Sequence, residues 1–380
     1  MIDKKKEKKR FIIQLYVIGG ILAFFITLLI LRQFENICEF WSRTYYRYFQ
    51  SVIGPLVSWI PFSITEIFVL AFAGSIIWLL VLVIRNLIKK NRMRSANHGL
   101  TIAIILVATA TFYFSTAGMA YGRAQVDIPQ YEGEVDYTQY VDVIEYFRDD
   151  FNNCSSQLEY NAEGGVISPY SISEINVLLQ AEYAKIDSSY FTAFTANVKP
   201  LLSSFIFTEF NIVGISFAPT TEPLINTLTP DSQLASAMAH ELAHSKGVLR
   251  EQDANLVAMY VCLNSDIPYL RYSGYFTTFG SLLNLSRYVG DPDKHDELYD
   301  TLDVSIRNDY NYYGQFWQKH DLLANMGRWV NDMYLKILGT EGVASYTDTP
   351  TIGSVTVGDT TVYFIEEFSP FQKLFFDLYF

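Results

Sequence analysis

Three long apolar runs near the start of the chain limit what it can fold into. They occupy residues 11–31, 67–84 and 100–120, and none of them contains a charged side chain. Each run is close to the ~20 residues that a helix needs to cross the hydrocarbon core of a bilayer. A cleaved secretory signal would have a shorter apolar region followed by small residues, which the first run lacks. We therefore predict a multi-pass membrane protein with three transmembrane α-helices.

The charge distribution predicts how these helices are oriented. The first 98 residues hold 14 of the 28 Lys and Arg but only 5 of the 40 Asp and Glu. Basic segments precede the first run and join the second to the third, and such segments stay in the cytoplasm. We expect a basic cytoplasmic tail at 1–10, a membrane domain at 11–122 and an extracytoplasmic domain at 123–380. The expected location is the cell membrane, with the lipid bilayer as a partner.

The outer part of the chain is acidic, which argues against nucleic acid as a partner because phosphate backbones require a basic protein face. Apolar residues recur there mostly at the three- and four-residue spacing of amphipathic helices. Two stretches are instead rich in strand-forming residues around Gly. The domain is expected to be mainly α, with a small β component. The predicted helices are 137–158, 171–186, 229–247, 251–267, 274–288, 295–309 and 328–339, and the predicted β elements are a strand in 210–219 and a hairpin in 352–365.

The helix predicted over 229–247, with Thr229 or Asp231 as its N-cap, contains the pattern H-E-x-x-H. His240 and His244 project from one face of a helix, so their ring nitrogens can converge on one ion. Glu241 points about one hundred degrees away from His240 and can reach a water molecule held by that ion. Two ligands and a base are what a zinc hydrolase needs. The alternative is an ordinary helix that carries two histidines by chance.

The sequence leaves two candidates for the third ligand. The metzincin pattern would require a third His at position 250, which is Arg250 and cannot bind a cation. The three cysteines lack C-x-x-C spacing, so a cysteine zinc site is not indicated. Two carboxylates follow closely, Glu251 and Asp253. The turn that brings a following helix back to the histidines falls at Gly247, a residue type that permits such a turn.

The segment EQDAN resembles the E-x-x-A-D pattern of gluzincin-type membrane metallopeptidases, namely the CaaX-prenyl endopeptidase and heat-shock integral membrane protease types. That resemblance implies Glu251 as the third zinc ligand, with Asp253 as the competitor. It also implies that Asn255, which stands where those proteins have Asp, orients a ligating imidazole. One Zn²⁺ per chain would complete a site of two histidines and one carboxylate.

The whole arrangement resembles an uncharacterised family of bacterial membrane proteins, a domain of unknown function. These proteins have three N-terminal helices and an outer zincin-like domain. The resemblance lies in HELAHSKGVLREQDAN at 240–255 and YLKILGTEGVASY at 334–346. It implies the architecture of the chain and a bacterial membrane location.

These observations lead to two hypotheses of function. The first is a membrane-anchored zinc metallopeptidase that cleaves a peptide or protein substrate outside the cytoplasm, with Glu241 as general base. The second is a non-catalytic binding or scaffolding protein whose metal site is structural or vestigial. The strand in 210–219 could bind an extended substrate or could be an ordinary core strand. The residue that stabilises the oxyanion could be any of many tyrosines, His295, His320 or Arg328, and the sequence predicts no oligomeric state.

Overall fold

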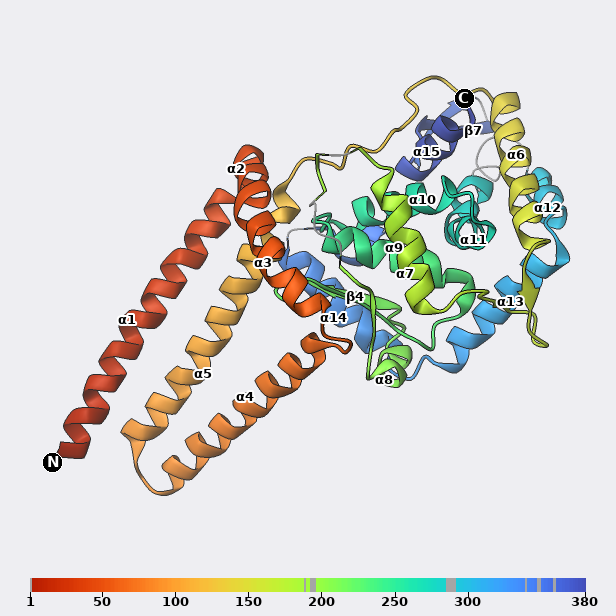
Figure 1. Ribbon diagram of the computed structural model, residues 1–380. Coiled ribbons are helices and arrows are strands. Elements are labelled where there is room, and N and C mark those ends of the chain that lie inside the picture. The colour runs from red at the N-terminus through yellow and green to blue at the C-terminus, as the bar shows by residue number, and fades with distance from the viewer. Residues whose placement is uncertain are drawn as a thin grey trace. The chain divides into compact units, whose positions relative to one another are not determined.

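The computed structural model describes residues 2–187, 189–191, 196–284, 292–338, 340–346, 350–357 and 360–380. The chain is mostly helical (Figure 1) and divides into two compact units. Of the described residues, the first unit contains 2–124 and 217–222. The second unit contains the others.

Three helices of the first unit are long and apolar enough to cross a membrane, which confirms the prediction of three long apolar helices. The candidate spans are Lys4–Leu31, Ile64–Ile88 and Arg92–Gly122. The corresponding helices are α1 (Ile2–Leu31), α4 (Ile64–Ile88) and α5 (Arg92–Tyr113), the last continued by η2 (Phe114–Gly118) and η3 (Ala120–Gly122).

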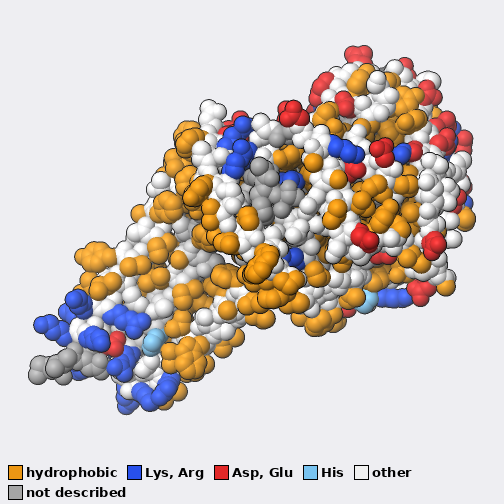
Figure 2. Space-filling view, in the orientation of Figure 1, with side chains coloured by type: hydrophobic (Ala, Val, Ile, Leu, Met, Phe, Trp, Pro, Cys, Tyr) orange, Lys and Arg blue, Asp and Glu red, His pale blue; other side chains and the backbone are white. Residues whose placement is uncertain are grey.

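Helix α5 packs against both α1 and α4. Inside the apolar region, the Gln14 side chain of α1 donates a 2.7 Å hydrogen bond to the Thr101 hydroxyl of α5. At the end of the unit that carries the N-terminus, Arg94 forms a 3.0 Å ion pair with Glu7. Figure 2 shows Lys and Arg side chains gathered at that end, whereas hydrophobic side chains cover the helices. Polar contacts therefore fix the register of α1 on α5 in surroundings that are otherwise apolar.

The N-terminus of α4 is closed by a side chain from far along the chain. The Glu222 carboxylate accepts hydrogen bonds from the backbone amides of Ile64 at 3.0 Å and Thr65 at 2.7 Å. The first amides of a helix have no partner within the helix, and its N-terminus carries partial positive charge. A carboxylate satisfies both requirements, which accounts for the burial of Glu222 in this unit.

A large hydrophobic core with α9 at its centre organises the second unit. Twelve of the fifteen residues of α9 are buried, and it packs against α10 and α11. Ala235, Ala239 and Ala243 are fully buried, and their small side chains let neighbouring helices approach closely. The helices of this unit are α6 (Tyr137–Ser155), α7 (Ile172–Ala184), α8 (Ser204–Glu209), α9 (Asp231–Ser245), α10 (Glu251–Leu263), α11 (Pro268–Asn284), α12 (Pro292–Asp300), α13 (Val304–Lys319), α14 (Ala324–Ile337), η5 (Gly342–Tyr346) and α15 (Pro370–Tyr379).

The β component is small, as predicted, and consists of three separate sheets among the described residues. The three-stranded sheet has the order β3-β5-β4, so β4 lies at an edge. The strand predicted in 210–219 is β4, and the predicted C-terminal hairpin is the antiparallel pair β6-β7. The strands are β1 (Glu159–Tyr160), β2 (Val166–Ile167), β3 (Lys199–Pro200), β4 (Gly214–Phe217), β5 (Glu222–Ile225), β6 (Thr351–Val357) and β7 (Thr360–Glu367).

The predicted N-caps of α9 are wrong. Its N-cap residue is Pro230, and no side chain caps it. The hydroxyl of Thr229 is buried without a hydrogen-bond partner among the described residues. Asp231 is already inside the helix, and its carboxylate accepts a 2.9 Å bond from the backbone amide of Ser168. The Asp231 side chain therefore makes a tertiary contact instead of capping the helix.

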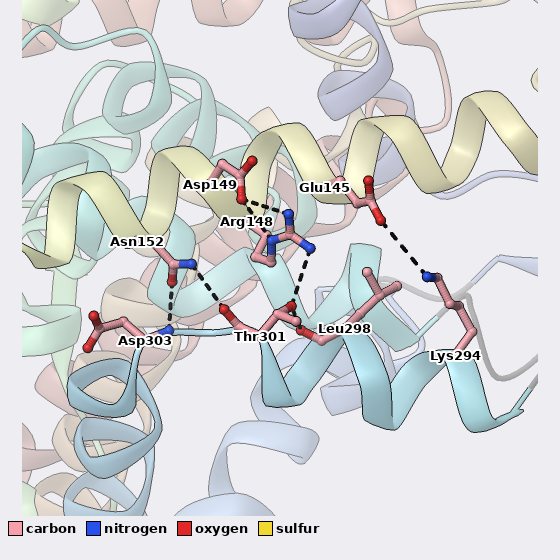
Figure 3. A network of polar contacts seen from close by, with 8 residues as sticks. All are labelled: Glu145, Arg148, Asp149, Asn152, Lys294, Leu298, Thr301 and Asp303. Atoms are coloured by element: carbon pink, nitrogen blue, oxygen red, sulfur yellow. Dashed lines mark hydrogen bonds and ion pairs between the residues drawn. The ribbon is translucent and has the colours of Figure 1, made fainter.

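One predicted helix, 295–309, is two helices with a break between α12 and α13. In the break, the backbone amide of Asp303 donates to the Asn152 side chain at 2.7 Å, and Asn152 donates to the carbonyl of Thr301 at 3.1 Å. Figure 3 shows these contacts together with Arg148, which lies one turn away from Asn152 on α6. Asp303 then caps α13. Hydrogen bonds to α6 thus replace those that a continuous helix would make.

Asp309 of α13 is an acidic group enclosed by the core. Its carboxylate accepts hydrogen bonds from the Tyr272 hydroxyl at 2.7 Å and the backbone amide of Val166 at 3.3 Å. Burial raises the pKa of Asp309 to about 6, against the lowering effect of these bonds. The group is therefore a candidate for pH-dependent stability.

Candidate metal centre

The two histidines of the H-E-x-x-H pattern lie on the last turns of α9 and face the same point. The ring centroids of His240 and His244 are 4.5 Å apart, with the ring planes at 85°. His244 is buried and His240 is half-buried. The rings are therefore close enough to share one ligand or ion, as the helical spacing predicts.

Helix α9 ends in a turn that allows the chain to return at once. Gly247 has φ +95°, the left-handed conformation that glycine adopts without steric cost. The amide of Gly247 donates to the carbonyl of His244 at 3.0 Å, and the amide of Val248 donates to that of Ala243 at 3.1 Å. These two bonds form a Schellman motif. The turn predicted at Gly247 is present, and it sends the chain directly into α10.

The first residue of α10 completes the cluster. One carboxylate oxygen of Glu251, Oε2, lies 3.2 Å from Nε2 of His240 and 3.4 Å from Nε2 of His244. A ligand atom from each of the three residues can be chosen so that all lie within 4.8 Å of one another. Ligand atoms about 2.0–2.1 Å from a tetrahedral zinc ion would be about 3.3 Å apart. The chemistry and spacing of these residues therefore fit a zinc ion.

The competing carboxylate of Asp253 is directed elsewhere. It pairs with Arg250, with Oδ2 2.8 Å from Nε and 2.7 Å from a terminal guanidinium nitrogen. Asp253 is also buried, although an acidic residue at a helix start is commonly solvent-facing. A carboxylate committed to a guanidinium is a poor metal ligand, so the geometry favours Glu251.

The Nδ1 atoms of the two histidines have different surroundings. Nδ1 of His244 lies 2.7 Å from the backbone carbonyl of Val248, which fixes Nδ1 as the protonated nitrogen and leaves Nε2 free to bind a metal. Nδ1 of His240 is buried and has no hydrogen-bond partner in the described part of the chain. The expected role of Asn255 is thus filled for His244 by a backbone carbonyl, which no side-chain pattern could have indicated.

The charges of Glu251 and the two histidines strongly affect one another. Burial would raise the pKa of Glu251, but the imidazole of His244 and hydrogen bonds from both histidines hold it well below its usual range. Burial would lower the pKa of His244, but the Glu251 carboxylate raises it to about 9. The carboxylate is therefore ionised and requires positive charge beside it. A divalent cation would supply that charge with both imidazoles neutral.

Glu241 is separate from this cluster and is buried. Burial raises the pKa of its carboxyl group to about 7, against the lowering effect of the two histidines. Its Oε2 atom has no hydrogen-bond partner among the described residues. An unpartnered buried carboxylate is costly, and such groups are common where acid–base chemistry takes place.

Gly214 of β4 makes room for Glu241. A Cβ atom at this position would lie 2.6 Å from Oε1 and 2.8 Å from Cγ of Glu241, and 2.9 Å from the backbone oxygen of Leu224. At separations below 3.0 Å one of the two groups must move. Gly214 was not predicted as a site residue, although a glycine inside a strand pattern often marks a close approach of this kind.

The other residues considered for the oxyanion are engaged elsewhere. Nδ1 of His295 lies 2.9 Å from the Asp296 carboxylate, and Nδ1 of His320 lies 2.8 Å from the Glu209 carboxylate. Arg328 donates to the side chain of its neighbour Asn325. None of the three belongs to the cluster formed by His240, His244 and Glu251. The structure thus assigns no oxyanion role to them.

A family model described as "Protein of unknown function (DUF3810)" matches the chain over residues 41–352. The match includes α4, α5 and all three residues of the cluster, His240, His244 and Glu251. No curated protein and no solved structure matches the chain significantly.

Proposed function

The chain belongs to the DUF3810 family, and we propose that it is a membrane-anchored zinc metallopeptidase that hydrolyses peptide bonds outside the cytoplasm. Residues His240, His244 and Glu251 hold one Zn²⁺, and Glu241 is the general base. The basic flanks of α1 and of the α4–α5 connection support the orientation, since basic segments remain in the cytoplasm. The second unit then lies on the outer side.

The observation that carries the proposal is the convergence of three ligand atoms with Glu251 Oε2 at 3.2 and 3.4 Å from the two imidazole nitrogens. Structural zinc sites in proteins are usually closed by four protein ligands. Catalytic sites use three and keep the fourth position open. Two histidines and one glutamate are a known catalytic set, so the donor set favours catalysis over a structural role.

Glu241 supplies the general base that a zinc hydrolase needs in addition to the metal ligands. When bound, zinc supplies Lewis acidity, which lowers the pKa of water toward ~7 and polarises a carbonyl group. Glu241 accepts the proton of the attacking water and returns it to the leaving amine. This carboxylate would have no role in a protein that only binds or scaffolds.

The edge strand supports a peptide substrate. Strand β4 lies at the edge of its sheet, and its residues are half-buried rather than enclosed. An extended peptide can pair with such an edge through main-chain hydrogen bonds, which are independent of sequence. Because Gly214 of this strand lies against Glu241, a peptide held there has its backbone close to the base.

The test uses the full-length protein in detergent or in lipid nanodiscs. Zinc content is measured by elemental analysis, and cleavage is measured on a mixed peptide library by mass spectrometry. We expect about one zinc per chain, and cleavage that chelation removes and zinc restores. Glu241→Gln should keep the zinc and lose cleavage, because an amide cannot accept the proton.

The two hypotheses differ in these results. Wild-type protein that binds zinc but cleaves no peptide of the library would favour the binding or scaffolding role. Absence of zinc after reconstitution would refute the metal centre. Cleavage by Glu241→Gln at the wild-type rate would refute the mechanism.

A further inference from the structure

The segment between α1 and α4 is folded with its polar side inward. It comprises α2 (Glu35–Trp41), η1 (Ser42–Tyr46) and α3 (Arg47–Ser58). Ser42, Tyr46, Gln50 and Gly54 are buried, and they recur every four residues on one face. A helix on the surface of a water-soluble protein normally buries its apolar face instead.

The opposite face is aromatic and aliphatic, and it is exposed. Tyr48 is 71% exposed, Leu56 66% and Trp59 88%. Val52 continues the stripe at the same helical spacing and is also exposed, whereas Tyr45 at its start packs against the rings of Trp41 and Phe49. No charged side chain occurs anywhere between Arg47 and Glu66. After Arg47, the exposed face of the segment therefore consists of apolar side chains and a few hydroxyl groups.

The inward face is fixed to the rest of the first unit. The indole nitrogen of Trp41 donates a 2.8 Å hydrogen bond to the backbone carbonyl of Ser115 in η2, which continues α5. The rings of Phe49 and Phe112 meet edge to face, with their centroids 5.7 Å apart. Phe49 thus holds α3 against the C-terminal end of α5, while Tyr48, Val52, Leu56 and Trp59 stay exposed.

The positions of the two ends of this segment identify the partner. Leu31 ends one candidate span and Ile64 begins the next, so both ends lie at the same surface of a bilayer if α1 and α4 cross it. The twelve residues of α3 measure about 18 Å along the helix axis, too short to cross the hydrocarbon core of about 30 Å. Trp and Tyr are enriched at the membrane–water interface.

We propose that residues 45–59 form an interfacial helix that lies in the outer face of the bilayer, with Tyr48, Val52, Leu56 and Trp59 among the lipids. This surface is distinct from the three spans and independent of the metal centre. A second copy of the chain is the competing occupant. The bilayer is favoured because it is continuous with both ends of the segment and because the stripe carries no charge that would select a protein partner.

The experiment places a nitroxide spin label on the stripe of the full-length protein in lipid nanodiscs. Val52→Cys is labelled, and Val177→Cys, an exposed valine of α7 in the second unit, is the matched control. Collision with oxygen, which concentrates in lipid, is compared with collision with a water-soluble nickel chelate. Leu56→Cys repeats the measurement in case Val52→Cys does not fold.

At Val52 or Leu56 we expect frequent collision with oxygen and at least fivefold less collision with the nickel chelate than at Val177. Equal access of the chelate to the stripe and to Val177 would overturn the proposal. Spin–spin broadening between labels, lost on dilution with unlabelled protein, would assign the stripe to a second copy and would also overturn it.

Discussion

Replacing Gly214 with alanine should abolish most hydrolysis while leaving the metal in place. The added Cβ atom would lie 2.6 Å from Oε1 and 2.8 Å from Cγ of Glu241. It would also lie 2.9 Å from the backbone oxygen of Leu224, so the strand cannot simply shift toward β5. Glu241 must turn away, because its side chain is the only flexible group among these neighbours.

The size of the effect follows from this displacement. Overpacking of a buried site costs about 1–3 kcal/mol, and a displacement of a catalytic group by about 1 Å can cost a hundredfold in rate. We expect kcat/KM of Gly214→Ala to fall by about a hundredfold, approaching the residual rate of Glu241→Gln. The zinc content should stay near that of the wild type, because neither Gly214 nor Glu241 belongs to the ligand cluster.

The matched control is Gly314→Ala on α13, where an added Cβ atom meets nothing within 4 Å. That change should leave activity unaltered and stabilise the helix by about 0.4–1 kcal/mol. Peptide cleavage, zinc content and melting temperature are measured on Gly214→Ala, Gly314→Ala and Glu241→Gln. Wild-type activity in Gly214→Ala would show that Glu241 does not act from its buried position. Loss of zinc would show that Gly214 supports the cluster itself.

Three further predictions concern the ligand, the topology and the response to pH. Glu251→Ala should lose most of its zinc affinity and Asp253→Ala should retain it, since only Glu251 contacts the histidines; the reverse result in titrations of folded protein would exchange their roles. A cysteine at the exposed position Ala162 should react with a membrane-impermeant thiol reagent on intact cells, and reaction only after lysis would invert the topology. Burial raises the pKa of Asp309 from 3.8 to about 6, so the folded state binds a proton more tightly than the unfolded state. The free energy of unfolding should therefore increase as the pH falls from 6 to 4, and decrease as the pH rises through the same range. Asp309→Asn should lack this response in thermal unfolding, and parallel pH profiles for wild type and variant would contradict the assignment.

The features that could be predicted from the sequence depend on short stretches of chain. The three apolar helices, the strand at Gly214 and the hairpin near the end were all indicated by local periodicity or composition. The same holds for the convergence of His240, His244 and Glu251, since all three lie within twelve residues on two helices joined by a glycine turn. Their identity as zinc ligands stays a prediction.

The features that could not be predicted depend on contacts between distant segments. The break before Asp303 forms because Asn152 of α6 binds the backbone there. Thr229 fails to cap α9, although its residue type favours that role. The place of Gly214 beside Glu241 requires β4 and α9 to pack together, which no single stretch specifies.

The nearness of the three ligands along the chain has a consequence for the order of folding. Loop-closure entropy grows with the separation of the residues that meet, and only ten residues lie between His240 and Glu251. We therefore expect the metal cluster to assemble early, as soon as α9 and α10 form, and zinc to stabilise that two-helix intermediate. The contact of Glu241 with Gly214 of β4 closes a longer loop, with 26 residues between the two. A refolding chain would therefore bring its metal ligands together at a lower entropic cost than its base, and would bind the metal before the base is in position.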